Sequence, residues 1–96
     1  MALLTDAEVA RELAALPGWS RVGQAIERQF VFRGFPEAVA FVQRLVPESE
    51  SSDHHPDLTI HYRRVTVSFT THSEGGLTPL DFDGAHMASR QAEPDA

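Results

Sequence analysis

Cysteine is missing from all 96 residues of the chain. Its absence excludes a disulfide framework, thiolate catalysis and a cysteine-ligated zinc site. Basic residues are also few: eight Lys and Arg stand against fourteen Asp and Glu, a formal net charge of -6 with neutral histidines. An acidic balance of this kind argues against nucleic acid as the main partner.

Long apolar runs are absent too, so no segment is expected to cross a membrane. The first residues lack the basic region and apolar stretch of a signal peptide. We therefore expect a cytoplasmic protein. The length fits a single domain over residues 1–96 whose small core favours a homo-oligomer.

Hydrophobic periodicity predicts the order helix, strand, strand, helix, strand, strand, helix. The predicted helices cover residues 5–15, 36–46 and 78 onward, and the predicted strands cover 19–22, 25–32, 58–63 and 65–70. Capping boxes indicate two of the helix starts, at Thr5 and at Thr78. Arg28 interrupts an apolar strand face, which suggests a position near a sheet edge.

Proline at position 47 is expected to end or kink the middle helix, leaving 48–53 as a distorted last turn or an exposed loop. Short connections between successive strands require antiparallel pairing. The predicted fold is therefore α+β and two-layered, with a four-stranded antiparallel sheet and helices packed on one face. The other face is left partly open and is a candidate interface.

Histidines form the most distinctive local pattern. His54 and His55 precede one strand of a predicted hairpin and His72 follows the other, so all three are expected at the open end of that hairpin. Asp81, in the first turn of the last helix, is expected within reach of His72, which it would orient. Because histidine titrates near neutral pH, such a cluster favours proton transfer.

Other interpretations stay open for these residues. Asp81 alone is often just a carboxylate that favours a helix start, and adjacent histidines are often surface loop residues. A metal site is conceivable, but neighbouring residues rarely bind one ion and the usual helical His spacing is missing. His61 and His86 are expected on the surface.

Residues spread along the chain resemble the signature of the pterin-4a-carbinolamine dehydratases. The resemblance is carried by Glu50, His54-His55-Pro56, Tyr62, Thr71-His72, Gly76-Leu77 and Asp81, and it extends to Gly18-Trp19 and to residues 26–32. It implies dehydration of 4a-hydroxytetrahydropterin to quinonoid dihydropterin, without a metal or a bound cofactor.

The resemblance also implies roles for particular residues. Its catalytic histidines match His54, His55 and His72, supported by Asp81. The residues expected to contact the pterin substrate are Glu50, Pro56, Leu58 and Thr71. Family members form homodimers or homotetramers, and one branch is known as a dimerisation cofactor of a transcription factor, so a non-catalytic assembly partner is the alternative function.

Two departures from the family pattern affect these expectations. Pro47 and Glu48 interrupt a helix that usually continues towards the histidine pair, which could displace Glu50. Leu58 stands where some relatives carry tryptophan, so one stacking surface for the pterin is expected to be smaller. Neither departure removes a proposed catalytic group.

Overall fold

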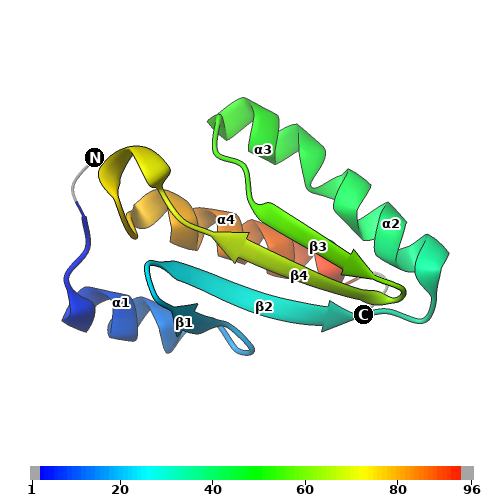
Figure 1. Cartoon of the computed structure of the whole chain (residues 1–96), viewed down its shortest axis with the longest axis horizontal. Coiled ribbons are helices and arrows are strands. Elements are labelled where there is room, and N and C mark those ends of the chain that lie inside the picture. Colours follow the sequence, from blue (N-terminus) through cyan, green and yellow to red (C-terminus); the bar gives the residue numbers. More distant parts are fainter. Residues whose placement is uncertain (1–2, 94–96) are drawn as a thin grey trace.

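A four-stranded antiparallel sheet forms one layer of the protein (Figure 1). The computed structural model describes residues 3–93. The strands are β1 (Ser20–Val22), β2 (Ala25–Val31), β3 (Asp57–His61) and β4 (Arg64–Phe69). Their order across the sheet is β1-β2-β4-β3, so the two predicted hairpins lie side by side with β2 and β4 in the centre.

Helices form the second layer, which confirms the predicted α+β class. They are α1 (Asp6–Leu13), α2 (Phe35–Arg44), α3 (Val46–Ser52) and α4 (Pro79–Ala92), with a short 3-10 helix η1 (His72–Glu74) before α4. Helix α4 crosses behind β2 and β4, while α2 and α3 follow one another beside β3 (Figure 1). None of the helices within residues 3–93 has the length and apolarity needed to span a bilayer; the cytoplasmic location stays a prediction.

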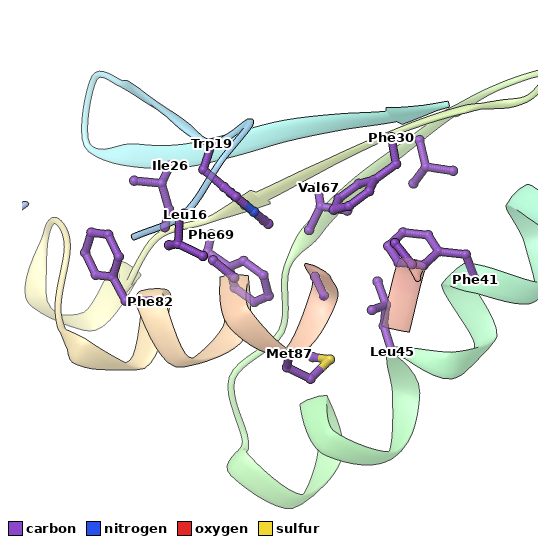
Figure 2. Close-up of a cluster of buried hydrophobic side chains, with 14 of the residues drawn as sticks. Leu16, Trp19, Ile26, Phe30, Phe41, Leu45, Val67, Phe69, Phe82 and Met87 are labelled. Carbon is purple, nitrogen blue, oxygen red and sulfur yellow. The ribbon is translucent and has the colours of Figure 1, made fainter. Parts of the chain in front are cut away.

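The core lies between the sheet and the helices because alternate strand residues face the same way. On β4, Val65, Val67 and Phe69 are buried, and the residues between them are only partly covered. Phe69 lies opposite Ile26 of β2 in the strand register, and Val65 lies opposite Phe30. Figure 2 shows Val67 and Phe69 of β4 and Phe30 of β2 in one cluster with Met87 of α4 and Phe41 of α2.

The segment 48–53 differs from the prediction of a loop or a distorted last turn. Residues 48–52 belong to α3, a separate helix that begins at Val46, immediately after α2, and Asp53 is its C-cap. Pro47 lies in the first turn of α3, where its missing N–H would have no helical partner in any case. The proline therefore starts a helix as well as ending one, and Glu50 remains on a helical turn.

Arg28 also differs from its prediction, because β2 has neighbours on both sides and is not an edge strand. Its guanidinium carbon lies 4.3 Å from the centre of the Phe30 ring, which accommodates the charge beside the core. The reversal between β3 and β4 is formed by Tyr62 and Arg63, with Tyr62 at a φ of 56°, so β3 ends two residues before the predicted strand 58–63 does. The helix predicted from 78 onward continues to Ala92, and 94–96 lie outside the described residues.

Candidate active site

The end of α3 places His54. Asp53 takes a left-handed conformation there, with φ 51° and ψ 40°. The backbone N–H of His54 donates to the carbonyl of Ser49 over 3.2 Å, and that of Asp53 donates to Glu50 over 3.3 Å. This reversal satisfies the last carbonyls of the helix and directs the chain away from α3, so that His54 faces the start of α4.

The start of α4 places Asp81. Thr78 and Asp81 form the capping box that the sequence predicts, in which the Thr78 backbone N–H donates to Oδ2 of Asp81 over 2.9 Å. The Thr71 hydroxyl donates to the same oxygen over 2.9 Å and contacts the Thr78 hydroxyl at 2.9 Å. Asp81 is fully buried. A buried carboxylate needs such donors to offset its lost hydration.

The other oxygen of Asp81 meets His54. Nε2 of His54 lies 2.6 Å from Oδ1, and the two side chains are 11% and 0% exposed. The imidazole stacks on Phe69 of β4 at 5.8 Å between ring centres and 20° between planes. Carboxylate and phenyl ring together fix the orientation of His54. A neutral imidazole that donates from Nε2 keeps its lone pair on Nδ1.

This pairing corrects the expectation that Asp81 would orient His72. Thr71 is extended, with φ -104° and ψ 93°, and successive side chains of an extended segment point to opposite sides. Thr71 is buried against Asp81, whereas His72 is exposed as the first residue of η1. The predicted partner of Asp81 was His72, at the start of η1, and the actual partner is His54, which follows α3.

His55 points elsewhere than His54. Its Nε2 lies 2.5 Å from Oε2 of Glu50, one turn earlier in α3, and both side chains are largely exposed. Glu50, His55, Pro56 and Leu58 line a common cavity of about 170 Å³. Four of the predicted site residues are therefore together, at a place where α3 meets the start of β3.

His72 lines a third place, an open cavity of about 270 Å³ with Thr70, Gly75 and Gly76. Within residues 3–93 its side chain has no hydrogen bond. The structure therefore joins His54, Asp81 and Thr71 in one network and gathers His55 with Glu50, Pro56 and Leu58. It does not bring His72 into contact with either set.

Sequence reasoning missed three residues that support His54. Thr78 was expected only as a helix cap, although its position three residues before Asp81 was the available signal. Phe69 was covered only by the predicted strand 65–70, with no role at the site. Gly84 of α4 gave no signal: a Cβ there would lie 2.6 Å from the Phe69 ring, so a glycine lets the phenyl ring fit beneath His54.

Within residues 3–93, no three His, Asp or Glu side chains are grouped so that they could hold a metal ion. The hydrogen-bonded arrangement suits proton transfer, because a carboxylate aligns an imidazole whose second nitrogen makes no hydrogen bond within residues 3–93.

Comparison with known proteins places this arrangement in a family. The family model described as "Pterin 4 alpha carbinolamine dehydratase" matches residues 2–91. The chain belongs to this family. It is 51% identical over 80 residues to a protein of Picosynechococcus sp. whose name assigns it as a pterin-4-alpha-carbinolamine dehydratase, covering 83% of this chain and 87% of that one.

Two further relatives cover almost the whole chain. A protein of Mycobacteroides abscessus with the same assigned name is 47% identical, over 95% of this chain and 97% of its own. A crystal structure titled as a transcriptional coactivator/pterin dehydratase from Brucella melitensis superposes with a TM-score of 0.90 at 39% identity, covering 94% of this chain and 98% of that one. The family and these names support a pterin carbinolamine dehydratase.

Proposed function

We propose that this protein dehydrates 4a-hydroxytetrahydropterin to quinonoid dihydropterin by histidine acid–base catalysis, without a metal or bound cofactor, as part of tetrahydropterin recycling. Family membership supports the reaction class. The observation that carries the mechanism is the 2.6 Å contact between His54 and the buried Asp81. Alignment of an imidazole by a carboxylate is a recurrent way to prepare it for proton transfer.

His54 acts as the base in this proposal. Dehydration removes one proton from a ring nitrogen and delivers one to the departing 4a-hydroxyl, which leaves as water while a carbon–nitrogen double bond forms. Because Asp81 accepts the Nε2 proton of His54, the nitrogen left to take a proton is Nδ1. Asp81 then stabilises the imidazolium that results.

His72 acts as the acid that protonates the 4a-hydroxyl. Its exposed position and its lack of a hydrogen-bonding partner among residues 3–93 leave it able to exchange protons with water. The pterin is bound by His55 and Glu50, which supply polar contacts, with Pro56 and Leu58 as an apolar wall. Thr71 contributes through Asp81 and makes no contact of its own with the pterin, since its side chain is buried.

Turnover of synthetic 4a-hydroxytetrahydropterin tests this assignment. Replacing His54 or His72 with Asn is expected to lower kcat by about 10²- to 10⁴-fold, the usual contribution of a positioned acid or base. His61→Asn is the matched control, because His61 is exposed on β3 and belongs to neither set. Full turnover by either His54→Asn or His72→Asn would refute the proposed role of that residue, and loss of turnover with a chelator would refute the metal-free mechanism.

A second candidate function is suggested by the Brucella structure, whose title also names a coactivator. In this alternative the chain is a non-catalytic dimerisation or assembly partner. The alternative predicts no turnover by the wild-type protein at any pH, and an equally folded His54→Asn variant that keeps its binding partners. Measurable wild-type turnover supports the enzyme instead.

We also propose that the protein forms a homodimer or homotetramer. Strand β3 pairs only with β4 among the described residues, which leaves one edge of the sheet unpaired. Leu58 and Ile60 of β3, with Val46 of α3, are large apolar side chains that stay 39–54% exposed. The partly open sheet face is more polar, carrying Glu27, Gln29 and Ser68. Light scattering of wild type and Ile60→Glu is the test, and a monomeric wild type contradicts it.

A further inference from the structure

A larger cavity lies at the other end of α4 from the proposed dehydratase site. Its volume is about 610 Å³, against about 170 Å³ for the cavity beside His55. Ser89, which lines it, is eight residues after Asp81, a separation of about 12 Å along the helix axis. None of the residues discussed above as catalytic or substrate-binding lines this cavity.

Arg28 of β2 provides the main charge of the cavity, and three contacts hold its guanidinium in place. The group lies over the Phe30 ring at 4.3 Å. It packs so closely on the backbone at Gly18 that a Cβ there would lie 2.8 Å from its Nε. One terminal nitrogen also donates to the Ser89 hydroxyl over 3.4 Å.

Arg28 forms no ion pair with a carboxylate within residues 3–93, and its one side-chain hydrogen bond there is to Ser89. A guanidinium has five N–H donors, and one hydrogen bond leaves most of them free. In a chain of net charge -6 with fourteen carboxylates, a partly buried arginine without a carboxylate partner is unusual. Its free donors line an open cavity.

The neighbouring polar groups add donors rather than acceptors. Ser89 Oγ accepts from the Trp19 indole at 2.9 Å as well as from Arg28, so its own hydroxyl hydrogen remains to be donated. His86 and Arg90 of α4 also line the cavity, against a single carboxylate, that of Glu93. Arg90 is 3.6 Å from the exposed Glu48, a weak surface contact that a ligand can replace.

The remaining lining is apolar and comes from Ala15, Leu16, Pro17 and Ala92. A donor-rich end beside an apolar wall suits a ligand that carries one negative group on an apolar body. We propose that this cavity binds an organic anion, a carboxylate or a phosphate ester with an apolar body, through the guanidinium of Arg28 and the hydroxyl of Ser89.

Trp19 gives a built-in reporter, because it is the only tryptophan of the chain and its indole shares the Ser89 hydroxyl. Titration with benzoate and with phenyl phosphate, followed by Trp19 fluorescence and by its indole N–H resonance, tests the proposal. At least one of the two is expected to bind saturably, and the stronger one identifies the anionic group. Neutral benzyl alcohol is expected not to bind.

Variants of the lining residues test whether the anion binds in this cavity. Arg28→Gln is expected to weaken it about ten- to a hundredfold, the effect of losing a charged hydrogen bond. Arg33→Gln is the control, since it removes the same charge from an exposed position paired with Glu37. Ser89→Ala, which leaves Arg28 in place, serves if Arg28→Gln does not fold. The proposal is overturned if neither anion binds below about 10 mM, if benzyl alcohol binds as well, or if Arg28→Gln and Ser89→Ala both bind as tightly as wild type.

Discussion

His54 and His55 are neighbours in the sequence, yet they occupy opposite environments. His54 is 11% exposed and contacts a carboxylate that is fully buried, whereas His55 is 51% exposed and contacts a carboxylate that is 70% exposed. Both pairs are short, at 2.6 and 2.5 Å. The two distances therefore do not show which ion pair contributes more to stability. The difference in burial does show it, because water competes for the exposed pair and a surface ion pair contributes only about 0–1 kcal/mol.

The difference arises from what holds each carboxylate. Asp81 receives hydrogen bonds from Thr78 and Thr71, so it cannot turn away from His54. The Glu50 carboxylate contacts only His55: it makes no other side-chain hydrogen bond within residues 3–93. The first pair can maintain one imidazole orientation through a catalytic cycle, and the second can adapt to a ligand.

The largest expected effect comes from removing each carboxylate in turn. Asp81→Asn keeps the shape but replaces one oxygen by an NH₂ group, which donates and does not accept. Either His54 or the Thr78 backbone N–H therefore loses its acceptor. Dehydratase kcat is expected to fall about 10²- to 10⁴-fold. Glu50→Gln, the matched change in the exposed pair, is expected to alter KM more than kcat. Steady-state kinetics measures both, and equal losses of kcat would show that burial is not the deciding difference.

The support beneath His54 gives a second test. Alanine at 84 gains about 1 kcal/mol of helix propensity over glycine, but its Cβ would lie 2.6 Å from the Phe69 ring. Overpacking of this kind typically costs 1–3 kcal/mol. Gly84→Ala is therefore expected to lower the free energy of unfolding by up to about 2 kcal/mol. It is also expected to lower kcat, because Phe69 must shift against His54.

A second substitution, at Phe69, tests whether the steric conflict causes the destabilisation by Gly84→Ala. In a Phe69→Leu background the steric conflict is smaller, so Gly84→Ala is expected to stabilise the protein there. Denaturant unfolding of the four proteins measures the coupling. A destabilisation of the same size in both backgrounds would mean that Gly84 does not act through Phe69.

Much of this arrangement was predictable from the sequence, and the reasons are local. Strand alternation and the capping residues Thr78 and Asp81 predicted the antiparallel sheet and the last helix correctly. The α3 helix was not predicted because 46–52 has no apolar stripe. It begins immediately after α2, with Pro47 in its first turn. Whether a proline ends a helix or starts a new one depends on the tertiary context. Which histidine meets Asp81 depended on the side to which Thr71 points, and one residue of register reverses that.

The third test concerns the hydroxyl that fixes Asp81. Thr71→Val removes a donor to a buried carboxylate and is expected to lower the free energy of unfolding by about 1–3 kcal/mol. Thr70→Val is the neighbouring control, whose hydroxyl donates to the Gln24 carbonyl over 2.6 Å in a more exposed place. Its expected cost is about 0.5–1.5 kcal/mol. Thermal unfolding of both variants measures the difference, which disappears if solvent reaches Asp81.

The smallest expected effect concerns the capping box at the start of α1. Thr5 and Glu8 repeat at α1 the geometry of Thr78 and Asp81, but on the surface. A hydrogen bond from the Thr5 backbone N–H, with a second from its hydroxyl side chain, lowers the pKa of Glu8. A lowered pKa means that the ionised carboxylate stabilises the fold above the usual glutamate range and that this contribution is lost as pH falls through the lowered value.

Glu8→Gln should therefore lower Tm slightly at pH 7, and the difference from wild type should shrink to nothing as the pH falls below the pKa of Glu8. Asp81→Asn gives the comparison in the buried capping box. Its effect on Tm at pH 7 should be several times larger, because the carboxylate it removes is shielded from water and accepts from three groups. Equal Tm shifts at pH 7 would show that capping geometry, and not burial, sets the contribution of such a carboxylate.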